Sequence, residues 1–190
     1  MNYDVLYLGG INMANKITQP IKDIEQIRKF KQEVNRGQNG FRNVLLVEIG
    51  LATALRISDL LKLRKNNIYD GFISIKTEKT DKPMRLELNP RVHKLVASYI
   101  ELLNDDDLLF NFGYRQALKM LSAAAERADI KDFGTHTLRK TCAWQYYQHF
   151  GKDLRKTMVL LGHESPNDTI KYLNLDIDEV NKDLVTMDLN

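Results

Sequence analysis

Apolar residues recur at helical spacing along most of the chain. The segment after Pro20 has one apolar face, formed by Ile24, Ile27 and Val34. The glycine-containing stretch 37–40 ends this pattern, so the sequence predicts an amphipathic helix between Pro20 and residue 37. The same reasoning predicts further helices over residues 41–51, 58–65, 91–103, 114–128, 137–150, 153–161, 166–173 and 177–185.

Two short segments alternate instead with a period of two. Residues 72–76 (Phe-Ile-Ser-Ile-Lys) and 84–88 (Met-Arg-Leu-Glu-Leu) have the pattern of strands, and the polar, lysine-rich stretch Thr77–Pro83 joins them. They predict one β-hairpin. The expected fold class is therefore mainly α (α+β), a helical domain with a small antiparallel sheet.

Length and composition indicate a single domain. The chain has 190 residues, of which 43% are hydrophobic and 28% charged, and it shows no repeat or linker. Residues 1–18 lack clear periodicity and are predicted to be a flexible N-terminal extension. Residues 19–190 are predicted to be the domain, with 175–190 as its C-terminal tail.

Other features limit the protein class. No apolar run is long enough to cross a bilayer, and the N-terminus lacks a signal-peptide pattern. The single cysteine, Cys142, excludes an internal disulfide framework and a multi-cysteine zinc site. These features predict a reduced cytoplasmic protein. The formal net charge is +3, with basic residues in excess over residues 1–100, which suits either a polyanionic partner or an ordinary solvated surface.

Arg56 lies in the otherwise apolar run Ala52–Leu61. A guanidinium that is partly buried there needs a compensating anion. Asp59 can supply that anion structurally, and a bound phosphate could share the role.

The stretch around residues 134–140 places polar groups at a predicted helix start. His136 and Arg139 are three positions apart, so they face the same side of the first turn, beside the positive end of the helix dipole. This arrangement suits a phosphate. A capped helix with an exposed histidine explains it equally well.

Gly162 ends a predicted helix and is followed by His163, while Ser165-Pro166 opens the next helix, which carries Tyr172. Any one of the eight tyrosines is more often a core or surface residue than a reacting group.

Taken together and in this order, these segments resemble the tyrosine recombinase (phage integrase) family over roughly residues 20–185. Thr53–Leu61 is similar to its first arginine box and His136–Thr141 to its second. Leu161-Gly162-His163 followed by Tyr172 is similar to its third. The closest likeness is to short integrase-like proteins of Gram-positive bacteria and their mobile elements.

The resemblance implies a site-specific DNA recombinase that breaks and rejoins DNA through a 3′-phosphotyrosyl intermediate, for integration, excision or inversion. Tyr172 would be the nucleophile, and Arg56 and Arg139 would stabilise the charge that develops on phosphorus. His136 would be the acid/base candidate and His163 mainly a phosphate donor.

In the family, a hairpin lysine protonates the departing 5′ oxygen. Lys79 matches that position best, and Lys76 and Lys82 are alternatives in the same segment. Exchange of a phosphodiester for a phosphotyrosyl ester roughly conserves bond energy, so the resemblance implies no cofactor and no metal.

Two residues depart from the family pattern. Ala54 stands where many members have glycine, and alanine is expected to fit if its φ is negative. Asp59 stands where most have glutamate. Neither change removes a reacting group.

The implied partners are double-stranded DNA, further copies of the chain in a tetramer on DNA, and accessory DNA-bending proteins, with no membrane. The acidic tail 175–190 would dock on a neighbouring subunit or fold back on its own core. Two other readings are a non-catalytic DNA-binding regulator with the same fold, and a helical interaction domain with coincidental motifs.

Overall fold

The computed structural model describes residues 7–8, 11–12, 18–76, 83–175 and 184–187. Two compact units make up the chain, residues 1–142 and 143–190, and their boundary falls within one helix. The predicted division into an extension, 1–18, and a domain, 19–190, stays a prediction. Most of the extension lies outside the described residues, which here form two short antiparallel strands, β1 (Tyr7–Leu8) and β2 (Ile11–Asn12).

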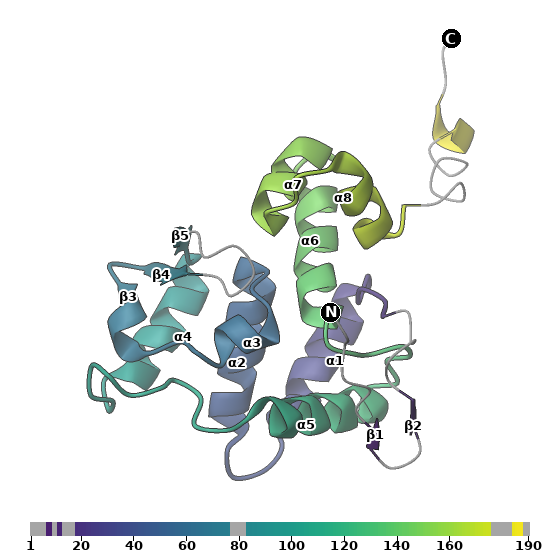
Figure 1. Ribbon diagram of the computed structural model, residues 1–190. Helices are drawn as coiled ribbons and strands as arrows, with labels where there is room; N and C mark the ends of the chain where they lie inside the picture. Colours follow the sequence, from purple (N-terminus) through teal and green to yellow (C-terminus); the bar gives the residue numbers. More distant parts are fainter. Residues whose placement is uncertain (1–6, 9–10, 13–17, 77–82, 176–183, 188–190) are drawn as a thin grey trace. The chain divides into compact units, whose positions relative to one another are not determined.

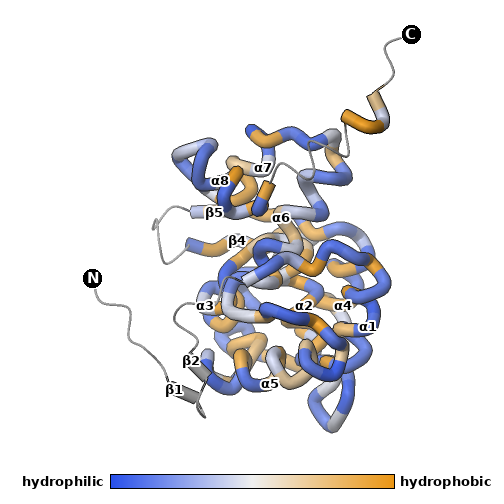
Figure 2. Tube along the Cα trace, turned by 90° about the vertical axis from the view of Figure 1, so that its right-hand side faces the viewer, coloured by the Kyte–Doolittle hydropathy of each residue, from blue (hydrophilic) through white to orange (hydrophobic). Residues whose placement is uncertain are grey.

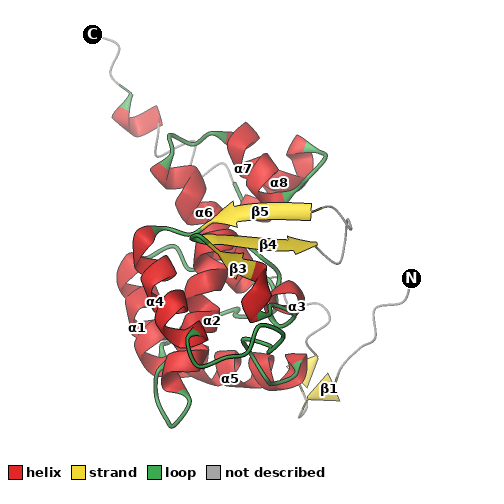
Figure 3. Cartoon of the chain, turned by 90° about the vertical axis from the view of Figure 1, so that its left-hand side faces the viewer, coloured by secondary structure: helices red, strands yellow, loops and turns green. Residues whose placement is uncertain are grey.

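Helices dominate the first unit (Figures 1 and 3). They are α1 (Ile24–Val34), α2 (Gly40–Thr53), α3 (Ile57–Leu60), α4 (Pro90–Ile100), α5 (Tyr114–Arg127) and the start of α6 (Thr137–His149). The α1 helix packs on α2 and α5, and α2 also packs on α3 and α4. Hydrophobic and hydrophilic residues alternate along these helices (Figure 2), as amphipathic packing requires.

A three-stranded antiparallel sheet completes this unit, in the order β3 (Ile68–Tyr69), β4 (Phe72–Lys76) and β5 (Pro83–Glu87). The β4–β5 register pairs Ile73 with Leu86, and Ile73 is fully buried. The mainly helical class with one small antiparallel sheet is confirmed. The hairpin loop, residues 77–82, lies outside the described residues.

Two boundaries differ from the sequence prediction. Helix α3 is a single turn that ends at Leu60, whereas the pattern predicted a helix over 58–65, because residues 65–67 instead form a 3-10 turn that leads into β3. The strand β3 itself was not predicted, since two residues are too short to show a period of two. The predicted helix 177–185 lies largely outside the described residues.

Buried aliphatic side chains form a continuous core in the first unit together with Phe30, Phe110 and Phe133. A buried carboxylate connects the helices around this core. Glu48 of α2 accepts hydrogen bonds from Lys31 of α1 (3.0 Å) and from both terminal nitrogens of Arg91 in α4 (2.9 and 2.6 Å). It therefore ties three helices together.

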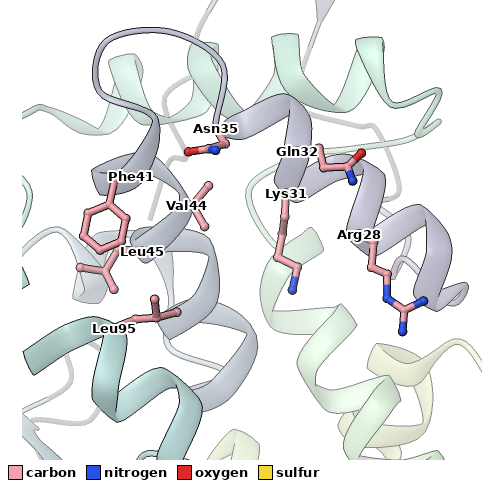
Figure 4. A pocket seen from close by; sticks show the side chains of 8 residues that line it. All are labelled: Arg28, Lys31, Gln32, Asn35, Phe41, Val44, Leu45 and Leu95. Carbon is pink, nitrogen blue, oxygen red and sulfur yellow. The ribbon is translucent and has the colours of Figure 1, made fainter. Parts of the chain in front are cut away.

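Beside this ion cluster, a cavity of about 380 Å³ opens between α1, α2 and α4 (Figure 4). Most of its wall is apolar, and it contains none of the site residues predicted from the sequence. Its lining residues are Arg28, Lys31, Gln32, Asn35, Phe41, Val44, Leu45 and Leu95.

The second unit contains the rest of α6 together with α7 (Leu154–Leu161) and α8 (Pro166–Leu173), which pack on each other. Gly162 ends α7 in the left-handed conformation (φ 60°), and Pro166 is the first residue of α8, as the sequence predicts. Among the described residues, no helix is long and apolar enough to cross a membrane.

Candidate functional site

The turn between α2 and α3 places Arg56. Ala54, fully buried, caps α2 in the left-handed conformation (φ 55°, ψ 19°), and its N–H donates to the Gly50 carbonyl. The Thr53 hydroxyl donates to the Ile49 carbonyl (2.7 Å) and accepts from Leu55 N–H (3.4 Å). The turn is thus fixed on both sides.

The condition under which alanine was expected to fit, a negative φ, is not met at Ala54, where φ is 55°. A helix that ends in a left-handed cap needs a positive φ at that residue, which is why glycine is favoured there, and an alanine there is strained. Hydrogen bonds on both sides of Ala54 and its complete burial hold it in this conformation.

Arg56 follows as the N-cap of α3. Its side chain is 25% exposed, and its Nη1 lies 4.0 Å from Oδ2 of Asp59, whose carboxylate is 1% exposed. The predicted ion pair is confirmed. The carboxylate supports the guanidinium from the buried side, and the exposed part of the guanidinium can take an anion.

Arg139 lies on the first turn of α6 and is 7% exposed. Its Nη1 donates a hydrogen bond of 2.5 Å to the carbonyl of Ala54. The strained residue of the first arginine box therefore orients the arginine of the second box, although the two lie 85 positions apart in sequence.

His136 lies directly before the first helical residue of α6 and is exposed overall. Its pKa lies below the ordinary value, first because the ring is partly buried and then because of the positive charges of Arg139, Arg56 and Lys140. Both guanidinium groups thus act on the same imidazole. The structure brings Arg56, His136 and Arg139 together, and their positive charges favour the neutral form of the imidazole.

Two contributors in this region have no motif of their own. The Ala54 carbonyl is a backbone group, which sequence patterns do not reveal. Lys140, next to Arg139, was not singled out, and the only sequence signal was a second basic residue directly after the arginine.

The second unit brings the remaining two motif residues together. The rings of His163 and Tyr172 meet edge to face, with their centroids 5.3 Å apart. Nδ1 of His163 lies at hydrogen-bond distance, 3.0 Å, from the hydroxyl of Thr169. Thr169 faces inward on α8 and is fully buried, a role that the sequence did not indicate.

Of the three candidate lysines, Lys79 and Lys82 lie outside the described residues. Lys76 is the exposed last residue of β4, so it leads directly into the hairpin loop. Within the described part of the chain, no three His, Cys, Asp or Glu side chains gather as ligands for a metal ion.

A match to the model of the phage integrase family covers residues 22–179. The chain is 31% identical over 171 residues to the probable integrase/recombinase YoeC of Bacillus subtilis, and the match covers 85% of this chain and 92% of that relative. The chain belongs to the phage integrase family. The resemblance that the three boxes indicated is thereby confirmed.

Integrase-family chains of greater length are also similar. The chain is 30% identical over 160 residues to the tyrosine recombinase XerD of Staphylococcus aureus. The match covers 76% of this chain and 54% of XerD, so the chain spans about half the length of that relative.

Solved structures have the same fold at lower identity. XerA recombinase superposes with a TM-score of 0.71 at 22% identity, over 88% of this chain and 63% of that chain. The catalytic domain of bacteriophage HP1 integrase gives 0.67 at 21% identity, over 91% of this chain and 97% of that domain. The fold is that of a tyrosine recombinase catalytic domain.

Proposed function

We propose that this protein is a site-specific DNA recombinase that breaks and rejoins DNA through a 3′-phosphotyrosyl intermediate. One observation carries the proposal: Arg56 and Arg139, from separate segments of the chain, both bring positive charge to His136, and part of the Arg56 side chain stays exposed. Family membership gives the reaction class.

The two arginines suit the electrostatic part of the reaction. Attack on a phosphodiester gives a five-coordinate phosphorus with extra negative charge on its non-bridging oxygens. Planar guanidinium donors hold such oxygens in a fixed orientation. Arg139 is oriented by the Ala54 carbonyl and Arg56 by Asp59, so little reorganisation is needed when charge develops.

Tyr172 is the proposed nucleophile. Its phenol loses a proton, its oxygen forms a bond to phosphorus, and the bond from phosphorus to the 5′ oxygen breaks. His136 is the proposed acceptor of the phenolic proton, and Lys79 is the proposed donor of a proton to the 5′ oxygen, with Lys76 and Lys82 as alternatives. Rejoining reverses these steps, so nothing is consumed.

The partners follow from this reaction. XerH recombinase is known bound to its difH substrate and lambda integrase as a tetramer on a Holliday junction. By extension, this chain would bind double-stranded DNA and assemble as a tetramer on it, with accessory DNA-bending proteins as further partners. A DNA substrate also favours the predicted cytoplasmic location.

The test is covalent capture. Duplexes that carry the recombination site, enriched beforehand by binding selection, are nicked beside the cleavage position and incubated with the protein. An SDS-resistant protein–DNA adduct is expected. Tyr172→Phe should abolish the adduct but leave the affinity for DNA within about twofold, because only the nucleophilic oxygen is lost.

Tyr146→Phe, a tyrosine of α6 with no motif role, is the matched control and should still form the adduct. A non-catalytic regulator would shift the DNA in a gel yet leave no adduct with the wild-type chain. An adduct that survives Tyr172→Phe would assign the nucleophile to another residue.

A further inference from the structure

The segment that leads into α1 lies against the start of α6. This segment, residues Thr18–Ile21, is called the strap here, and the structure describes both the strap and the loop before α6. The N–H of Gln19 donates to the Asp132 carbonyl (3.3 Å), and the N–H of Ile21 donates to the Thr141 hydroxyl (2.9 Å, buried). More than a hundred residues separate the two segments in sequence.

Lys140 adds the central contact. Its Nζ donates a hydrogen bond of 2.8 Å to the Thr18 carbonyl. The ammonium is partly buried, and this burial lowers the pKa of Lys140. Burial of a charge costs free energy, and the hydrogen bond to the Thr18 carbonyl offsets part of that cost.

Gly134 shows how closely the strap approaches. A Cβ built on Gly134 would lie 2.4 Å from the Thr18 methyl carbon, and Gly134 has no positive φ that would itself demand glycine. The Gly134 N–H also donates to the Thr137 hydroxyl (3.0 Å), which fixes the loop at the helix start. A Cβ at this position would therefore press on the Thr18 side chain of the strap.

The first turns of α6 are thus held from two sides. Arg139 reaches the Ala54 turn, while its neighbours Lys140 and Thr141 reach the strap. Because His136 and Arg139 belong to this same short stretch, a displacement of the strap would move both relative to Arg56.

We propose that Lys140 is a positioning residue, through which the strap Thr18–Ile21 sets the place of His136 and Arg139 for the reaction. The inference rests on the proposed function and adds a structural link from the segment entering the domain to the phosphate-binding side chains. A substitution that displaces the strap should change the rate of DNA cleavage and leave the affinity for DNA unchanged.

The first experiment compares single-turnover adduct formation in wild type, Lys140→Met and Lys140→Arg. Lys140→Met keeps the length of the side chain but loses the hydrogen bond, and it should slow adduct formation about tenfold, since small misplacements at a reacting centre are costly. The affinity for DNA should stay within about twofold, and Lys140→Arg should restore most of the rate. Lys131→Met, an exposed lysine in the loop before α6, is the charge-matched control and should keep the wild-type rate.

A second experiment needs no DNA. The positive charges of Arg139, Arg56 and Lys140 lower the His136 pKa, so Lys140→Met should raise that pKa, which NMR titration measures. Gly134→Ala removes no charge, so a changed His136 pKa in that variant reports a displaced turn. Adding Thr18→Ala removes the clashing methyl and should return the pKa to the wild-type value.

The outcomes separate the two claims. No adduct with wild type would overturn the proposed function, and the NMR titrations would still test the strap. A wild-type rate in Lys140→Met, or a Gly134→Ala effect that Thr18→Ala fails to reverse, would overturn the positioning role. A weaker affinity with a smaller salt dependence in Lys140→Met would assign Lys140 to direct phosphate contact instead.

Discussion

At the scale of single residues, a hydrogen bond to a strained backbone carbonyl governs one of the two arginines. Arg139 donates from Nη1 to the Ala54 carbonyl. This bond restricts the orientation of the planar guanidinium. Strain at Ala54 thus has a use, because the left-handed turn that costs energy also directs the carbonyl toward Arg139.

The strain at Ala54 predicts an unusual response to glycine. In a helix interior, Ala→Gly costs about 1 kcal/mol. At Ala54, relief of about 1–2 kcal/mol of left-handed strain offsets the loss of chain entropy and of the buried methyl group. Ala54→Gly should therefore leave the free energy of unfolding in urea almost unchanged.

Ala52→Gly, two residues earlier in helical α2, is the matched control and should lose about 1 kcal/mol or more. Equal losses at both positions would show that Ala54 carries no strain.

Cys142 is a buried residue of α6 near the Ala54 turn. It lies three residues after Arg139, and burial raises the pKa of its thiol to about 12, against smaller effects of the Ala54 backbone and the Arg139 charge. The thiol stays protonated at neutral pH and serves packing at the turn.

At the scale of elements, Glu48 joins α1, α2 and α4. Burial alone would raise the pKa of this carboxyl, but hydrogen bonds from Arg91 and Lys31, with their charges, lower it below the ordinary value. A carboxylate with a depressed pKa in the folded state stabilises the fold above its unfolded pKa of about 4.3, and this stabilisation is lost as the pH falls through the folded pKa.

Glu48→Gln should lower the free energy of unfolding by about 2 kcal/mol at pH 7, since two cations lose their buried partner while remaining partly hydrated. The deficit relative to wild type should shrink as the pH falls from neutral toward about 3. Urea denaturation over this pH range measures it.

Glu126→Gln, an exposed position on α5, should change little at any pH. A Glu48→Gln deficit that stays constant with pH would contradict the role of the ionised carboxylate.

The sequence-based prediction was wrong for elements that are too short to show a repeating hydrophobic pattern. Helix α3 ends after one turn, although the chain beyond it is still apolar and buried at Leu63, and a run of apolar residues does not distinguish one turn from two. The longer helices, α2, α5 and α6, were predicted within two residues, since several periods of hydrophobic spacing define them.

At the scale of the whole molecule, charge predicts how DNA binding responds to salt. A protein that contacts about six phosphates releases their counterions and loses roughly a thousandfold in affinity between about 50 and about 200 mM salt. With a sequence pI near 8.8, this chain should show a linear fall of log affinity with log salt. Fluorescence anisotropy with a labelled duplex measures the slope, and an affinity independent of salt would contradict phosphate-dominated binding.

The amino-acid sequence by itself determined the family and most helices, because motif order and hydrophobic spacing are properties of the chain as written. It also determined which residue types are available for the reaction. Only the tertiary structure decided the positive φ of Ala54, the bond from Arg139 to its carbonyl, and the contact of Lys140 with Thr18. The two hydrogen bonds join segments that lie 85 and 122 residues apart in sequence. Such contacts depend on how helices and loops pack against one another, which no local sequence pattern encodes.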